Sequence, residues 1–96
     1  MNVHHLHDQR TYQIIGAAME VHRILHRGLL ESIYCEALAV ELDLRSIPFA
    51  PQVPCQIVYK ERRLTGFHRI DFVCFNDVVV EVKASSLDLP GLFRTT

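Results

Sequence analysis

Tryptophan is absent from this chain, and its 96 residues include only three cysteines, four glycines and four prolines. The three thiols, Cys35, Cys55 and Cys74, are odd in number and widely spaced, and no CxxC pair occurs. This pattern argues against a disulfide framework and against a zinc or redox motif. We therefore interpret the cysteines as buried thiols of a protein in a reducing compartment, and we expect a cytoplasmic location.

Strong charge of one sign and long apolar runs are also missing. The formal net charge is -1, which argues against nonspecific nucleic-acid binding because such binding depends on an excess of Lys and Arg. No stretch approaches the ~20 apolar residues of a membrane span, and Met1 to Asp8 lack the apolar core of a secretory signal. We expect one domain over 1–96, with 1–9 flexible and 85–96 a divergent tail.

The apolar residues that are present predict two helices followed by strands. Ile14, Ala18, Val21 and Leu25 recur at helical spacing, which predicts a helix that ends at about Leu25. A second, broader apolar stripe predicts a helix over 30–44. Alternation over 52–59, 63–67, 69–75 and 78–82 predicts strands, the first of them half-buried. The order indicates an α+β fold with two N-terminal helices packed on a mainly antiparallel sheet of about four strands.

The last two predicted strands contain the most informative residues. The even-numbered positions Ile70, Phe72, Cys74, Val78, Val80 and Val82 are all apolar, so we expect one buried face to hold all six. Asp71, Glu81 and Lys83 then share the other face, provided that the connecting loop has an odd number of residues. We predict a loop of three residues, or a bulge near 75–78.

Two carboxylates beside a lysine are suited to metal-dependent phosphodiester hydrolysis. Asp71 and Glu81 offer hard oxygen ligands for Mg²⁺ or Mn²⁺, and the Val82 carbonyl is a third candidate ligand. Lys83 could orient the attacking water or stabilise charge on the phosphate. The alternative interpretation is that these three are ordinary charges on the solvent face of a hairpin.

A second pattern lies at the start of the second helix, where Gly28, Glu31 and Tyr34 fit GxxExxY. Together with 15–22, 47–49, 52–54, 59–60, 69–71 and 80–84, this pattern resembles the GxxExxY proteins of the PD-(D/E)XK nuclease superfamily. The resemblance implies Asp71, Glu81 and Lys83 as the nuclease signature and Glu31 as a helix-borne acidic partner. Pro90-Gly91 disfavours a long helix after the signature. The resemblance therefore also implies a nuclease-like core that lacks the C-terminal helix and strands of the superfamily.

Glu31 and Tyr34 each have a second explanation. Glu31 could instead be a first-turn acid that complements the helix dipole, and we expect Tyr34 to be a packed ring whose hydroxyl finds a hydrogen bond. His22 and His26, one helical turn apart, form an alternative zinc pair, although the pattern of a zinc protease is not found between them.

Nucleic-acid contact is predicted near the turn before the Asp71 strand. The candidate residues there are Lys60, Arg62, Arg63 and Arg69, which could contact phosphates or simply be solvated. The function that we predict is a metal-dependent nuclease that acts on nucleic-acid phosphodiesters. The competing hypothesis is a catalytically inactive interaction module of the same fold that forms a homodimer.

Overall fold

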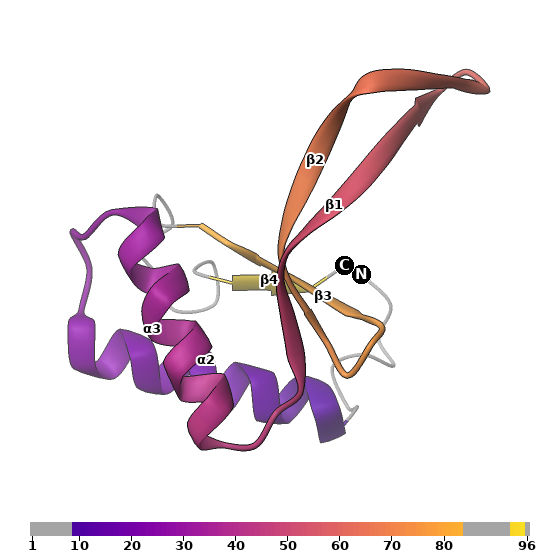
Figure 1. Ribbon diagram of the computed structural model, residues 1–96. Helices are drawn as coiled ribbons and strands as arrows, with labels where there is room; N and C mark the ends of the chain where they lie inside the picture. The colour runs from indigo at the N-terminus through magenta and orange to yellow at the C-terminus, as the bar shows by residue number, and fades with distance from the viewer. Residues whose placement is uncertain (1–8, 84–92, 96) are drawn as a thin grey trace.

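The computed structural model describes residues 9–83 and 93–95, which form two helices and one antiparallel sheet (Figure 1). The elements, in chain order, are α2 (Gln9–Leu25), α3 (Glu31–Leu44), β1 (Phe49–Tyr59), β2 (Arg62–Cys74), β3 (Val78–Val82) and β4 (Phe93–Thr95). The strand order is β1-β2-β3-β4, with antiparallel neighbours. The predicted α+β fold is therefore confirmed. The expectations for 1–9 and 85–96 fall largely outside the described residues.

The core lies between the two helices and the β2–β3 part of the sheet. Burial of apolar side chains holds these elements together. Leu38, Leu42, Val80 and Val82 are each 0% exposed. The core cluster comprises Ile14, Ala17, Val21, Tyr34, Leu38, Leu42, Ile47, Phe72, Cys74, Val80 and Val82. The helical periodicity of the sequence thus corresponds to the buried face of α2. The broad burial expected for the helix over 30–44 is wrong, because this segment buries Tyr34, Leu38 and Leu42 and leaves exposed the apolar side chains of Leu30, Ile33, Val40 and Leu44.

The number of long strands differs from the prediction. The segments 63–67 and 69–75, expected as separate strands, form the single strand β2, so the sheet has three long strands. The three-residue β4 pairs with β3 as an additional edge strand. The pairing between β1 and β2 is irregular near Gly66. Opposite the single residue between Gln56 and Val58, β2 contains three residues between Phe67 and Arg63.

The far halves of β1 and β2 form an arm that projects from the helices (Figure 1). We define the arm as residues 54–69. Every residue in it is exposed except Cys55, which is half-buried. The prediction of a half-buried first strand is therefore wrong beyond Cys55. Alternation in a sequence identifies a strand, but burial requires a covering layer, and no helix of the described chain covers the arm.

The connection between β2 and β3 sets the faces of both strands. Cys74 pairs with Val78, so the loop contains three residues, Phe75 to Asp77. Phe75 and Asn76 have positive φ values of 53° and 69°. This confirms the predicted loop length, and the buried even-numbered face follows from it. The odd-numbered residues of the two strands therefore lie on the other face.

Candidate active site

The site begins where β2 separates from β3. The ladder between these strands pairs Phe72 with Val80, and Asp71 and Glu81 occupy the next two facing positions. The backbone N–H of Val82 donates a hydrogen bond of 2.7 Å to Oδ2 of Asp71. The Asp71 carboxylate thus accepts the hydrogen bond of the Val82 N–H at the point where β2 turns away into the arm and its backbone no longer provides an acceptor. This bond fixes Asp71 beside β3 and leaves its second oxygen for a ligand.

Glu81 is held in the same region by a histidine from the base of the arm. Its side chain is only 13% exposed, and its Oε1 lies 3.1 Å from Nε2 of His68. This contact joins the arm to the carboxylates. Sequence reasoning did not identify His68 as a site residue, because no spacing rule links it to a residue thirteen positions later.

Helix α3 contributes a third carboxylate and a thiol. Burial, followed by the carboxylates of Asp71, Glu31 and Glu81 in that order, raises the pKa of the Cys35 thiol to about 11. The carboxylates of all three residues therefore lie close enough to the Cys35 thiol to affect its pKa. Glu31 and Cys35 are separated by one helical turn, so they share a side of α3. Sequence reasoning missed Cys35, although its i,i+4 spacing from Glu31 was a usable signal.

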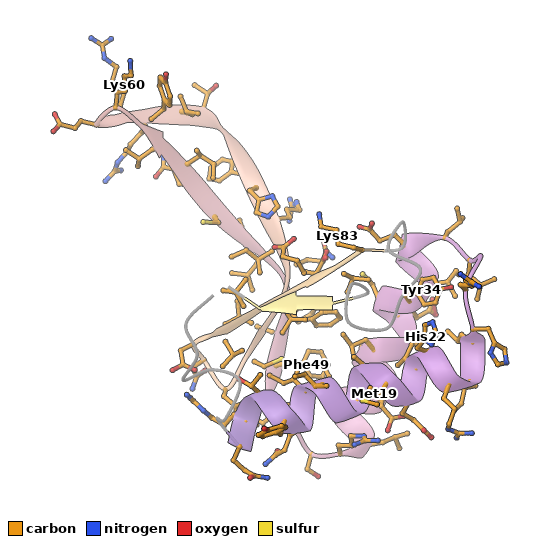
Figure 2. The ribbon with its side chains drawn as sticks, turned by 180° about the vertical axis from the view of Figure 1, so that it is seen from behind. Met19, His22, Tyr34, Phe49, Lys60 and Lys83 are labelled. Carbon is orange, nitrogen blue, oxygen red and sulfur yellow. The ribbon has the colours of Figure 1, made fainter. Side chains whose placement is uncertain are left out.

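Lys83 follows β3 directly and is half-buried. It lies two residues after Glu81, so strand alternation places both on one face. Figure 2 shows Lys83 near the base of the arm, far from Lys60 at its tip. Lys83 forms no ion pair with any residue in 9–83. Its ammonium group is therefore available to an anionic ligand.

The donor set suits a hard cation that retains much of its water. Within the described residues, no group of three or more His, Cys, Asp or Glu could hold a metal ion. That finding argues against a zinc site, including one built on His22 and His26. Mg²⁺ needs only one or two carboxylates besides water and substrate oxygens, and Asp71 and Glu81 are the two that would hold it here.

The GxxExxY residues also organise the connection between the helices. The Tyr34 hydroxyl donates a hydrogen bond of 2.7 Å to the carbonyl of His26 and accepts one of 3.2 Å from the N–H of Leu29. Gly28 has a φ of 104°, which side chains disfavour. Tyr34 is 1% exposed. Its expected role as a packed, hydrogen-bonded ring is confirmed, and the motif positions the start of α3, where Glu31 lies.

The cations predicted to contact phosphates are all on the arm. Lys60, Arg62, Arg63 and Arg69 are exposed, and Nζ of Lys60 lies 5.5 Å from the centre of the Tyr59 ring. Lys60 and Glu61 form the tip of the arm, with φ values of 49° and 66° that are typical of a tight two-residue hairpin turn. The arm presents these cations to solvent without a carboxylate partner among the described residues.

A family model described as the PD-(D/E)XK nuclease superfamily matches residues 8–88. The chain belongs to the PD-(D/E)XK nuclease superfamily. No match was found among curated proteins or among solved structures. Superfamily membership agrees with the α+β fold. In the described part of the chain, neither helix has the length and apolar character needed to cross a bilayer.

Proposed function

We propose that this PD-(D/E)XK superfamily protein is a metal-dependent nuclease of the GxxExxY type. The observation that carries the proposal is the meeting of Asp71 and Glu81, from adjacent strands, at the point where β2 leaves β3. A lysine on the same face and a third carboxylate from α3 complete the set. Free thiols suit a reducing compartment, so a cytoplasmic location is part of this proposal.

Each residue has a defined role in the proposed reaction. The carboxylates of Asp71 and Glu81 and the carbonyl of Val82 would hold Mg²⁺ or Mn²⁺. When bound, such an ion polarises a phosphoryl oxygen and lowers the pKa of a coordinated water. Lys83 orients the attacking water and stabilises the negative charge that develops on the phosphate. Glu31 accepts a proton or a hydrogen bond from water on the α3 side.

Two residues support this arrangement without contacting the reacting atoms. The N–H of Val82 fixes one oxygen of Asp71, and His68 restrains Glu81. Nucleic acid is the proposed substrate, with Lys60, Arg62, Arg63 and Arg69 as its phosphate contacts. Cations of this kind position the backbone of a nucleic acid rather than read its sequence.

Cleavage assays with matched variants test the proposal. Wild type, Asp71→Asn, Glu81→Gln and Lys83→Ala would be purified in parallel and incubated with single- and double-stranded DNA and RNA in Mg²⁺ or Mn²⁺. Asp43→Asn is the control, since Asp43 is an exposed carboxylate of α3. We expect Lys83→Ala to lose roughly a hundredfold or more in rate, and the control to match wild type.

Metal binding gives a second readout that does not depend on turnover. Calorimetric titration with Mg²⁺ should show saturable binding to wild type that Asp71→Asn abolishes. The amide introduced by Asp71→Asn still offers an oxygen acceptor to the Val82 N–H, so the variant retains the local fold while losing the charge. Equal cleavage by all variants would indicate a contaminating nuclease and refute the site. No cleavage together with no metal binding would favour the inactive interaction module.

A further inference from the structure

The arm differs in charge from the rest of the protein. Residues 54–69 contain four of the ten Lys and Arg residues but only one of the eleven Asp and Glu residues. The arm therefore carries a net charge of +3, and the remainder carries -4. The overall charge of -1 conceals this separation. An anionic partner would be attracted to the arm and repelled by the body.

The arm also exposes large apolar side chains. Tyr59 is 60% exposed and Phe67 is 68% exposed, and Ile57, Val58 and Leu64 are exposed as well. An isolated two-stranded hairpin is only marginally stable in water. Exposed apolar side chains on such an arm therefore indicate a surface that is covered by a bound ligand. Aromatic rings among cations are typical of proteins that bind single-stranded nucleic acid, because bases stack on the rings while Lys and Arg contact phosphates.

Strand register separates the two aromatic rings. Cys55, Ile57 and Tyr59 project from one face of β1 because side chains alternate along a strand. Cys55 lies opposite His68, so His68 projects from that same face. Phe67 lies opposite Gln56 and projects from the other face. The Tyr59 face therefore carries His68, the arm residue whose side chain contacts a residue of the candidate active site.

The connection to the active site is direct. His68, on the Tyr59 face, contacts Glu81. Tyr59 and Cys55 are four residues apart, which is roughly 13 Å along a strand. This is the length of a few nucleotides. A strand bound at the tip of the arm would thus reach the carboxylates after a short extended segment.

We propose that the substrate is single-stranded nucleic acid, bound along the Tyr59 face of the arm with one base stacked on Tyr59. The base stacks on the ring face opposite Lys60, whose ammonium lies over the Tyr59 ring and contacts the phosphate of the stacked nucleotide. A duplex does not fit this arrangement because its bases are already stacked on one another. The inference rests on the proposed nuclease function and names its substrate class.

A second copy of the chain is the main competing occupant of the arm. The apolar residues of the arm are divided between its faces, with Tyr59 and Ile57 on one and Phe67 on the other. Neither face therefore offers the large contiguous apolar area that stable dimers bury. Lysine is also depleted in such interfaces, whereas Lys60 stands at the tip of the arm. These features favour nucleic acid.

Binding measurements without divalent metal test the inference separately from catalysis. Fluorescence anisotropy in EDTA would compare a labelled single strand of about 12 nucleotides with the corresponding duplex, using the full chain. The variants are Tyr59→Ala, Tyr59→Trp, and Phe67→Ala as the matched control on the opposite face. We expect Tyr59→Ala to weaken single-strand binding roughly tenfold to a hundredfold. Tyr59→Trp should retain binding, and Phe67→Ala should stay close to wild type.

The outcomes distinguish this inference from the proposed function. Binding that depends on Tyr59 in a protein that never cleaves would support the inference and refute the nuclease. Cleavage that is unaffected by Tyr59→Ala would do the reverse. Equal losses in Tyr59→Ala and Phe67→Ala, or equal affinity for the duplex, would overturn the inference. So would sedimentation showing that Tyr59→Ala dissociates a dimer without changing nucleic-acid affinity.

Discussion

Cys35 offers a direct test of metal binding, because burial and, to a smaller extent, three carboxylates hold its pKa at about 11. A divalent cation between Asp71 and Glu81 would neutralise two of these carboxylates. The pKa of Cys35 should then fall, since nearby negative charge no longer opposes thiolate formation. The alkylation rate of Cys35 should rise, because the thiolate is the nucleophile.

The size of the effect follows from the pKa. At about pH 8, a thiol with a pKa near 11 is only ~0.1% thiolate. Burial is the largest cause of the shift, and metal binding leaves it in place. A change in nearby charge moves a pKa by roughly one unit or more. The alkylation rate of Cys35 in Mg²⁺ should therefore rise about tenfold.

The assay is site-resolved alkylation with iodoacetamide, quantified by mass spectrometry with and without Mg²⁺. Cys74 is the internal control, because burial alone raises its pKa to about 11. Its rate should not respond to metal. Asp71→Asn should raise the rate of Cys35 without metal and remove the response to Mg²⁺. An unchanged Cys35 rate at Mg²⁺ concentrations that saturate calorimetric binding would refute the placement of the ion between Asp71 and Glu81.

Three further predictions concern stability, each measured by urea denaturation. Tyr34→Phe leaves the His26 carbonyl and the Leu29 N–H without their partner and should lower the free energy of unfolding by roughly 1–3 kcal/mol; an unchanged midpoint would mean that water replaces the hydroxyl. Gly28→Ala, at a φ of 104° with open space around the new methyl group, should cost about 1 kcal/mol from backbone strain alone. Between about pH 9 and 11 the protein should lose stability, because the Cys74 thiol ionises near 9.0 when unfolded but keeps its proton to about 11 when folded. Cys74 contributes roughly 3 kcal/mol of that loss, and a slope that is the same in Cys74→Ala would contradict it.

Several features of the fold could be predicted from local rules. Helical spacing of apolar residues located α2 and α3, because each helix buries one stripe. The loop between β2 and β3 could be predicted because strand alternation has a period of two residues. Only an odd loop puts Phe72 and Val80 on the buried face together, and the same parity brings Asp71 alongside Glu81.

Other features depend on tertiary structure that a sequence pattern does not encode. Alternation from Val53 to Tyr59 identified a strand but not that its outer half lacks a covering layer. The segments 63–67 and 69–75 were expected as two strands, whereas they form the continuous strand β2, with an irregularity in its pairing with β1. The contact of His68 with Glu81 and the position of Cys35 among carboxylates depend on how the arm and α3 meet the sheet.

The three-residue loop Phe75 to Asp77 has a consequence for how this protein tolerates changes in length. Loss or gain of a single residue there would preserve two well-paired strands and a short reversal, yet it would rotate every later side chain of β3 to the opposite surface. Glu81 would point into the hydrophobic core and Val82 toward water. A deletion that looks harmless by loop standards would therefore be as damaging as losing both acidic groups, whereas paired changes of two residues would leave the chemistry aligned.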